Sequence, residues 1–188
     1  MYRKLFLTII IVLFFIGTTG SQQISPQKIV PGEWIRSWLL CGPIPLQQQK
    51  DPSQSMDHLA GFNNDYLVKA GGEKNLHVKA GDVVKFTKGS AKWRLYNSPD
   101  SEIDLDKAIS FEEPVLAYAY TEIQAEETGV WFISLGTNDG GSLWINGLNI
   151  WDYRQPRGIS VDDDVIPVLL NKGNNTLLLK IEDRGNRW

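Results

Sequence analysis

The residues best suited to bind a ligand are aromatic and polar side chains near the end of a predicted strand. The chain contains seven tryptophans, a high count for 188 residues. Sugar rings dock on flat aromatic faces while polar side chains bind the hydroxyl groups, so an exposed indole or phenol ring suits a carbohydrate ligand. Trp151, Tyr153 and Arg154 lie where a predicted strand passes into a loop, and we predict that they contribute to such a site. Asn138 and Asp139 are further candidates, although turn formation alone also explains these two residue types.

The remaining tryptophans in predicted strands are expected in the core. Trp38, Trp131 and Trp144 each fall in the middle of such a strand, where a large apolar side chain is most readily buried. The exposure of Trp151 and Tyr153 therefore distinguishes a sugar-binding domain from one that only packs its aromatic residues internally.

Three consecutive acids are weak candidates for a structural calcium site. Asp162, Asp163 and Asp164 supply the carboxylate oxygens that Ca²⁺ prefers. A solvated turn is the alternative interpretation of the same residues. The sequence indicates no other cofactor.

Support for catalysis is slight. Glycosidase chemistry requires two carboxylates across a cleft, and the scattered acids of this chain do not identify such a pair. Gly-x-Ser-x-Gly, His-Glu-x-x-His and phosphate-loop motifs do not occur. Cys41 lies in an apolar stretch and is expected to be a buried thiol, and His58 and His77 lie in polar surroundings. We predict no catalytic residue, and an enzyme of unrecognised type stays open.

Short strands and tight turns must position these residues. In the window 129–151, Asn146-Gly147 is a strong hairpin signal, because both residues tolerate positive φ and a type I′ turn matches the twist of its strands. The window predicts a meander of three antiparallel strands, Val130–Leu135, Ser142–Asn146 and Leu148–Trp151.

Further segments have strand composition and are separated by turn residues. They are residues 34–40, 83–86, 93–96, 115–123, 165–170 and 176–182. Pro167 indicates an edge or a bulge in its strand, and little regular structure is expected between residues 47 and 81. Since no heptads, long amphipathic helices or internal repeats occur, the sequence predicts an all-β antiparallel sandwich.

The N-terminus has the pattern of a secretory signal peptide. A positive Arg3-Lys4 precedes the apolar run Leu5–Ile16 and small residues up to Ser21. The run is shorter than the ~20 residues that span a bilayer, although an uncleaved anchor stays open. We predict a signal peptide at residues 1–21, a flexible leader at 22–33 and the sandwich domain at 34–188. The protein is then exported to the periplasm, cell surface or medium, with no membrane contact after cleavage.

The net charge and the cysteine count bear on nucleic-acid binding and on disulfide formation. The formal net charge is −3, which disfavours nucleic-acid binding because that depends on clustered Lys and Arg. The single cysteine excludes an intramolecular disulfide.

Two blocks of the sequence resemble the galactose-binding-like jelly-roll family, whose modules accompany secreted bacterial glycoside hydrolases. The first contains Asp139-Gly140 and Trp144-Ile145-Asn146-Gly147, and the second contains Leu170-Asn171-Lys172-Gly173-Asn174 before an aliphatic strand. The resemblance implies a jelly roll that binds carbohydrate or packs beside a fused or downstream hydrolase domain. Such modules usually have one more core strand than this chain provides before Trp188, which implies a longer protein or a sandwich that lacks its last strand.

The turn Asn138–Gly141 also resembles the turn of PA14-type sandwiches, in which paired acids hold calcium against a sugar. Here Asn138 stands in place of the first acid. From residues and resemblance together we predict a non-catalytic exported module that binds carbohydrate or accompanies a hydrolase. The alternative is a structural or protein-interaction sandwich without sugar affinity.

Overall fold

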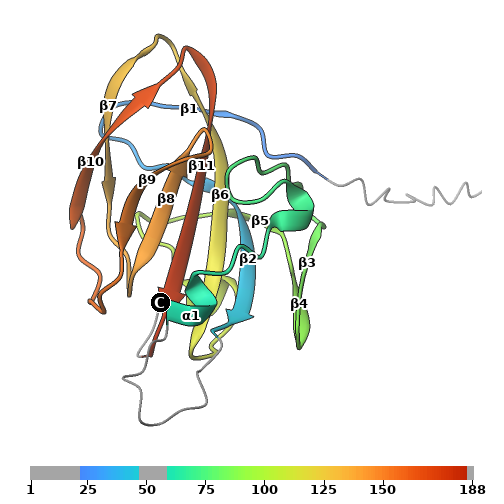
Figure 1. Cartoon of the computed structure of the whole chain (residues 1–188). Coiled ribbons are helices and arrows are strands. Elements are labelled where there is room, and N and C mark those ends of the chain that lie inside the picture. Colours follow the sequence, from blue (N-terminus) through green and yellow to red (C-terminus); the bar gives the residue numbers. More distant parts are fainter. Residues whose placement is uncertain (1–21, 47–58, 186–188) are drawn as a thin grey trace, which may run out of the picture.

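The computed structural model describes residues 22–46 and 59–185, which form an all-β sandwich (Figure 1). The larger sheet has the order β5-β2-β6-β11-β8-β9, and β1 pairs in parallel with β6. Its strands are β1 (Gln27–Lys28), β2 (Ser37–Pro45), β5 (Arg94–Asn97), β6 (Val115–Ala125), β8 (Gly141–Ile145), β9 (Leu148–Tyr153) and β11 (Gly173–Asp183).

Both faces of the larger sheet are covered. On one face lies a two-stranded antiparallel sheet, β7 (Gly129–Leu135) with β10 (Asp164–Leu170). On the other face lie short elements of the segment 59–93, as Figure 1 shows. These are α1 (Leu59–Phe62), the 3₁₀ turn η1 (Val68–Ala70), and the hairpin of β3 (Val83–Phe86) and β4 (Gly89–Lys92). The short helix α2 (Leu105–Ala108) packs on the first face.

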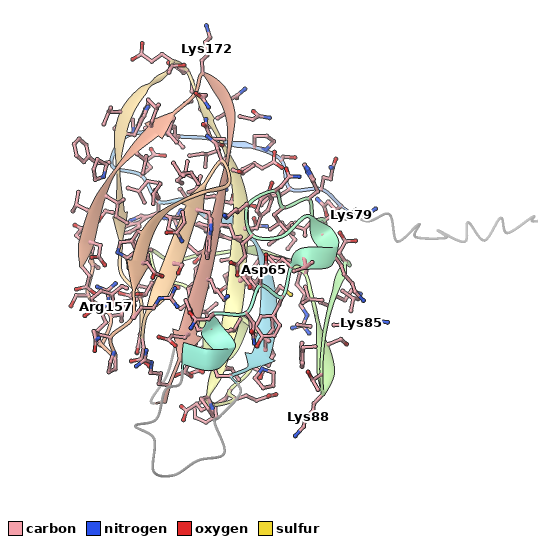
Figure 2. The ribbon with its side chains drawn as sticks, viewed as in Figure 1. Asp65, Lys79, Lys85, Lys88, Arg157 and Lys172 are labelled. Atoms are coloured by element: carbon pink, nitrogen blue, oxygen red, sulfur yellow. The ribbon has the colours of Figure 1, made fainter. Side chains whose placement is uncertain are left out.

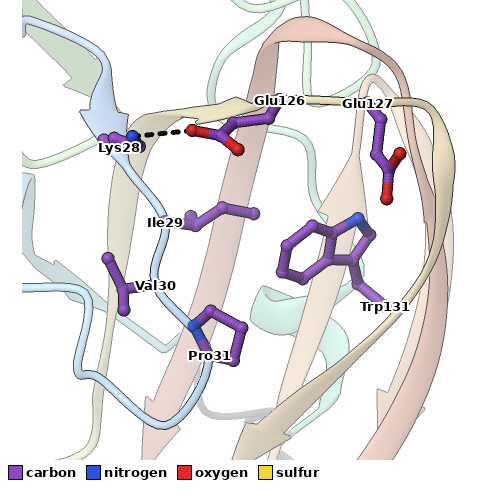
Figure 3. A pocket seen from close by; sticks show the side chains of 7 residues that line it. All are labelled: Lys28, Ile29, Val30, Pro31, Glu126, Glu127 and Trp131. Atoms are coloured by element: carbon purple, nitrogen blue, oxygen red, sulfur yellow. Dashed lines mark ion pairs between the residues drawn. The ribbon is translucent and has the colours of Figure 1, made fainter.

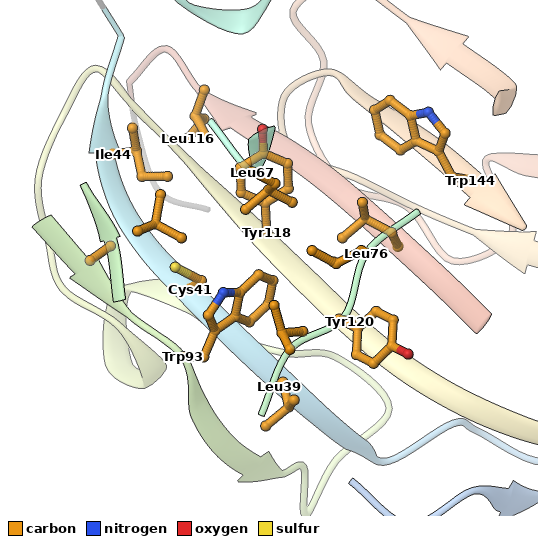
Figure 4. Packing of buried hydrophobic residues seen from close by; sticks show 14 of the residues in the cluster. Leu39, Cys41, Ile44, Leu67, Leu76, Trp93, Leu116, Tyr118, Tyr120 and Trp144 are labelled. Carbon is orange, nitrogen blue, oxygen red and sulfur yellow. The ribbon is translucent and has the colours of Figure 1, made fainter. Parts of the chain in front are cut away.

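The burial pattern of each strand follows from these layers. Strands β6, β8 and β11 are buried almost throughout, as expected for strands covered on both faces, which need near-continuous apolar sequence. Strands β7 and β10 alternate between inward and outward residues, because only one of their faces meets the core. Two apolar cores result, one on each side of the larger sheet (the core beneath residues 59–93 is drawn in Figure 4).

A buried ion pair lies between the larger sheet and the segment 59–93. The side chain of Lys180 on β11 is 2% exposed, and its ammonium group donates to Glu73 Oε1 at 2.8 Å and to the Asn64 carbonyl at 2.7 Å. Tyr118 on β6 donates to the same Glu73 oxygen at 2.6 Å. Burial lowers the pKa of Lys180, and the Glu73 carboxylate opposes this shift.

The backbone around Glu73 is fixed by a second carboxylate. Asp65, labelled in Figure 2, accepts hydrogen bonds from the N–H groups of Leu67 at 2.8 Å and Glu73 at 3.0 Å. The segment thus forms a compact loop that holds Glu73 over the larger sheet.

The predicted all-β sandwich is confirmed, but the predicted meander is wrong. Strand β7 pairs with β10 in the smaller sheet, and β8 pairs with β9 and β11 in the larger one. The turn after β7 therefore crosses from one layer to the other instead of closing a hairpin. Turn residues alone do not distinguish these two connections, because both need a sharp reversal of the chain.

The hairpin of β8 and β9 is confirmed. Asn146 and Gly147 have φ of 50° and 78°, and Ile145 pairs with Leu148 on either side of them. Strand β2 begins later than predicted and runs to Pro45, with an irregular register between Cys41 and Ile44 that accommodates its proline-containing segment.

The segment predicted to be a flexible leader packs against the sandwich. Gln27 Nε2 donates to the Ser37 carbonyl at 2.7 Å and to Thr121 Oγ1 at 2.8 Å, and Ile24 is 5% exposed. Residues 1–21, predicted as a signal peptide, lie outside the described residues, as do His58 and the last three residues up to Trp188. In the part of the chain that is described, no helix is long and apolar enough to cross a bilayer.

We expect Gly147→Ala to destabilise the fold more than Gly173→Ala. Both glycines have positive φ, 78° and 92°, which strains any residue with a Cβ. At Gly147 the new Cβ would also overlap the Lys74 carbonyl oxygen, whereas nothing lies within 4 Å at Gly173. Urea unfolding should show losses of about 3 and about 1 kcal/mol, respectively. Equal losses would mean that the hairpin does not pack on the segment 59–93.

We expect Glu73→Gln to cost about 3 kcal/mol, because it leaves the Lys180 ammonium buried without its counter-charge. The double variant Glu73→Gln/Lys180→Met removes both charges and should recover much of that loss. The free energy of unfolding in urea measures both effects. A double variant less stable than Glu73→Gln would contradict a buried ion pair at this position.

Candidate functional site

Two of the predicted site residues form a stack that an arginine covers. The rings of Trp151 and Tyr153 on β9 lie 6.4 Å apart between centroids, with 7° between their planes. The Arg157 guanidinium lies 4.2 Å from the Tyr153 centroid and 5.7 Å from that of Trp151. Both aromatic residues are half-buried. The Arg157 guanidinium thus occupies an aromatic face that is predicted from the sequence to bind a sugar.

The Arg157 side chain is held in place from several directions. Its guanidinium donates to the carbonyl and the hydroxyl of Thr137, at 3.2 and 2.9 Å, and pairs with Asp164 at 2.6 Å. Arg157 was missed in the sequence, where it stands in a polar loop without any motif.

The three consecutive acids are bound by groups of the protein itself. Asp164 and Asp163 pair with Arg157 at 2.6 and 3.9 Å. Asp163 also accepts from the Ser160 N–H at 2.9 Å, and Asp162 accepts from the Ser134 hydroxyl. Among the described residues, no group of three or more His, Cys, Asp or Glu side chains could hold a metal ion. These contacts account for Asp162 and Asp163 as residues that fix the loop before β10, and for Asp164 as the ion-paired first residue of that strand.

Asp139 joins three segments of backbone. It is 6% exposed, and its two carboxylate oxygens accept from the N–H groups of Arg157 at 3.1 Å and Arg184 at 2.8 Å. Its own N–H donates to the Glu182 carbonyl at 2.7 Å. Asp139 thus connects the crossover after β7 to the end of β11, and the preceding Asn138 is half-buried in the same turn.

Arg154 lies apart from this cluster. Its guanidinium pairs with Asp152 at 2.7 Å and lies 4.2 Å above the ring of Phe62, which covers the opposite face of the larger sheet. The structure therefore brings Asp139, Trp151 and Tyr153 together around Arg157, and directs Arg154 elsewhere.

A more open aromatic site lies at the other edge of the sandwich. A cavity of about 590 Å³ opens beside β7, between Trp131 and the segment 28–31 (Figure 3). The indole ring faces an apolar wall, and carboxylates from the turn after β6 lie above it. The lining residues are Lys28, Ile29, Val30, Pro31, Glu126, Glu127 and Trp131.

The charged groups of this cavity are exposed. Lys28 pairs with Glu126 at 2.7 Å. The hydrogen bond and charge of Lys28 lower the pKa of Glu126, and Glu126 raises the pKa of Lys28 in return, so both stay ionised. Glu127 makes no salt bridge with a described residue. The cavity thus offers one paired and one unpaired carboxylate beside an indole ring.

The sequence does not predict this cavity. The mid-strand position of Trp131 predicts burial in the core, but the residue is half-buried and only partly packed against the core between the sheets. Residues 22–33 are predicted to be a flexible leader, although the apolar triplet Ile29-Val30-Pro31 indicates that this segment packs against other residues. A smaller cavity of about 160 Å³ includes Tyr120 and Trp144 on its lining, but both are almost fully buried.

Comparisons with known proteins identify no relative. No protein-family model matches the chain, and searches of curated proteins and of solved structures find no match.

Buried acids near the end of β11 make stability depend on pH. Asp183 accepts from the Gly185 N–H at 2.8 Å, while its other carboxylate oxygen is buried without a hydrogen-bond partner. Burial raises the pKa of Asp183 to about 6 from its usual 3.8. The folded state therefore binds this proton more tightly than the unfolded state, and stability falls as the pH rises from about 4 to about 6.

We expect the effect of Asp183→Asn on stability to be more favourable at pH 7 than at pH 4, because the amide cannot ionise. The difference in free energy of unfolding between the variant and the wild type should rise by on the order of 1 kcal/mol from pH 4 to pH 7. Urea unfolding of both proteins at pH 4, 5, 6 and 7 measures it. A mutational effect that does not vary with pH would contradict the raised pKa.

Proposed function

We propose that this chain is a non-catalytic, exported β-sandwich module that binds carbohydrate in the cavity beside Trp131. The observation that carries the proposal is the half-exposed indole ring, which has an apolar wall on one side and carboxylates above it (Figure 3). The volume of about 590 Å³ falls within the usual range for small-molecule sites.

The lining chemistry matches the two surfaces of a sugar ring. The indole of Trp131, with Ile29 and Pro31, would contact the apolar C–H face of the ring. The carboxylates of Glu126 and Glu127 would accept hydrogen bonds from sugar hydroxyl groups, and charge-assisted bonds of this kind are the stronger ones. The position at an edge of the sandwich leaves room for a polymer to extend into solvent.

The cavity is a better candidate than the Trp151–Tyr153 stack. Arg157 already lies over that stack, so a sugar would have to displace a guanidinium that donates two hydrogen bonds to Thr137 and pairs with Asp163 and Asp164. At Trp131, by contrast, the space next to the ring is open. Binding at Trp131 needs no such displacement.

A binding role is favoured over hydrolysis by the arrangement of the carboxylates. Glu126 and Glu127 are consecutive residues on one wall, and Glu126 is paired with Lys28. Cleavage of a glycosidic bond requires an acid and a base on opposite sides of the bond. The all-β sandwich also suits the galactose-binding-like resemblance, from which the role beside a hydrolase domain is inferred. Export is inferred from the signal-peptide pattern of residues 1–21.

A second candidate function, protein interaction without sugar affinity, is favoured by a different observation. The outward face of β7 and β10 carries large apolar side chains that the described residues leave exposed. Such a surface is typical of protein contacts.

We expect Trp131→Ala to weaken glycan binding by about 10- to 100-fold, because a ring stack and its desolvated contacts are worth on the order of 1.4–2.8 kcal/mol. A glycan array on the purified protein would select the ligand, and isothermal titration calorimetry would measure the change. Trp34→Ala is the matched control, since Trp34 is 46% exposed and does not line the cavity.

Glu127→Gln should weaken the same binding without affecting the fold, because Glu127 is exposed. This variant separates a loss of contacts from a loss of packing around Trp131. Wild-type protein that binds no glycan, or equal losses in Trp131→Ala and Trp34→Ala, would reject the proposed site.

A further inference from the structure

The outward face of the smaller sheet is a continuous apolar surface. Phe132 and Val130 on β7 are 70% and 67% exposed, and Leu169 on β10 is 63% exposed. We call this surface the β7–β10 face. Its apolar members are Val130, Phe132, Val165, Pro167 and Leu169.

The strand register places these side chains next to one another. Val130 pairs with Leu169 and Phe132 pairs with Pro167, while Val165 lies opposite Ser134. Directly opposed side chains in an antiparallel pair are about 4.5–5.5 Å apart between Cβ atoms, so the five residues form one patch. Proteins that act as monomers rarely expose a large contiguous patch of this kind.

We propose that a second copy of this chain docks on the β7–β10 face and forms a symmetric dimer. The two smaller sheets would pack face to face, about 10 Å apart and nearly aligned, as sheets do in sandwiches. The two-fold axis would lie in the contact plane, across the strands at the level of Phe132 and Pro167. Phe132 then contacts Phe132 of the second copy, and ring pairs of this type are favourable.

The charges at the two ends of β10 suit this arrangement. Lys172 follows β10 and is exposed, with no salt bridge to a described residue. The exposed Asp162 precedes β10, together with Asp163, whose side chain is 22% exposed and lies 3.9 Å from Arg157. Figure 2 shows Lys172 at one end of the molecule and Arg157, the neighbour of these acids, towards the other. The axis reverses the strands, so Lys172 of each copy approaches the acids of the other.

The same axis matches bulky side chains with smaller ones. The end of the face with Val130 and Leu169 lies against the end with Ser134 and Val165 of the second copy. Such a contact uses one patch twice and closes on itself, so assembly stops at two chains.

The size of the face predicts a weak dimer. Seven residues per strand at about 3.3 Å each give a contact about 23 Å long and two strands wide. This is smaller than standard specific interfaces, which bury about 1,200–2,000 Å² in total, and places the contact among weak, transient ones. We expect a dissociation constant on the order of 10–100 μM, and therefore dimers only at high protein concentration.

Sedimentation velocity over a concentration series from about 5 to 500 μM tests the proposal. Wild-type protein should shift from monomer to dimer, and Phe132→Ser should raise the dissociation constant by about tenfold or more. Phe111→Ser is the matched control, because Phe111 is also 70% exposed but lies outside the β7–β10 face. Lys172→Glu should weaken the dimer as well, since it places like charges together.

Two results would overturn the proposal. The first is wild-type protein that stays monomeric at the highest concentration, and the second is Phe111→Ser weakening the dimer as much as Phe132→Ser. A second measurement tests the axis directly: with oxidised glutathione, Phe132→Cys should form a covalent dimer much faster than Phe111→Cys. Equal rates would contradict the two-fold contact. None of these results depends on sugar binding, because Trp131 points to the opposite side of β7.

Discussion

The ammonium group of Lys180 is the interaction on which the covering of the larger sheet depends. A cation at the centre of a sheet that is buried on both faces requires a counter-charge and hydrogen-bond acceptors, because leaving it unpaired would cost several kcal/mol. Glu73 and the Asn64 carbonyl supply them, and the Tyr118 hydroxyl binds the same carboxylate. The rings of Phe62, Tyr66 and Tyr118 lie within 6 Å of the ammonium group. A segment with little regular structure is thereby fixed in one position over the sheet.

A comparable constraint fixes the other layer. Asp139 binds backbone N–H groups from two distant segments, and Arg157 connects Thr137 with Asp164 on β10 while stacking on Tyr153. These contacts hold the smaller sheet against the edge strand β9 and occupy the aromatic residues there. The opposite edge, beside β7, has no such cluster among the described residues, and the cavity at Trp131 lies there.

Strand β7 thus contributes to two different surfaces. Its side chains alternate with a period of two residues, so Trp131 points toward the cavity while Val130 and Phe132 point to solvent. A dimer formed on the outward face would leave both cavities accessible. Two linked sites bind a polymer more tightly than one site does, since the second contact becomes intramolecular. The proposed ligand site and the proposed interface are therefore compatible in one assembly.

The sequence by itself determined the class of fold and most of the strands, because strand composition and turn chemistry are local properties. Asn146-Gly147 specified its hairpin through two residues that accept positive φ. The tertiary structure alone decided that β7 pairs with β10, that residues 22–33 pack on the sandwich and that Trp131 borders a cavity. It also decided the roles of Arg157 and Lys180, whose partners lie up to 116 residues away. Strand partners, burial and ion pairs depend on which distant segments meet, and no local pattern in the chain encodes that choice.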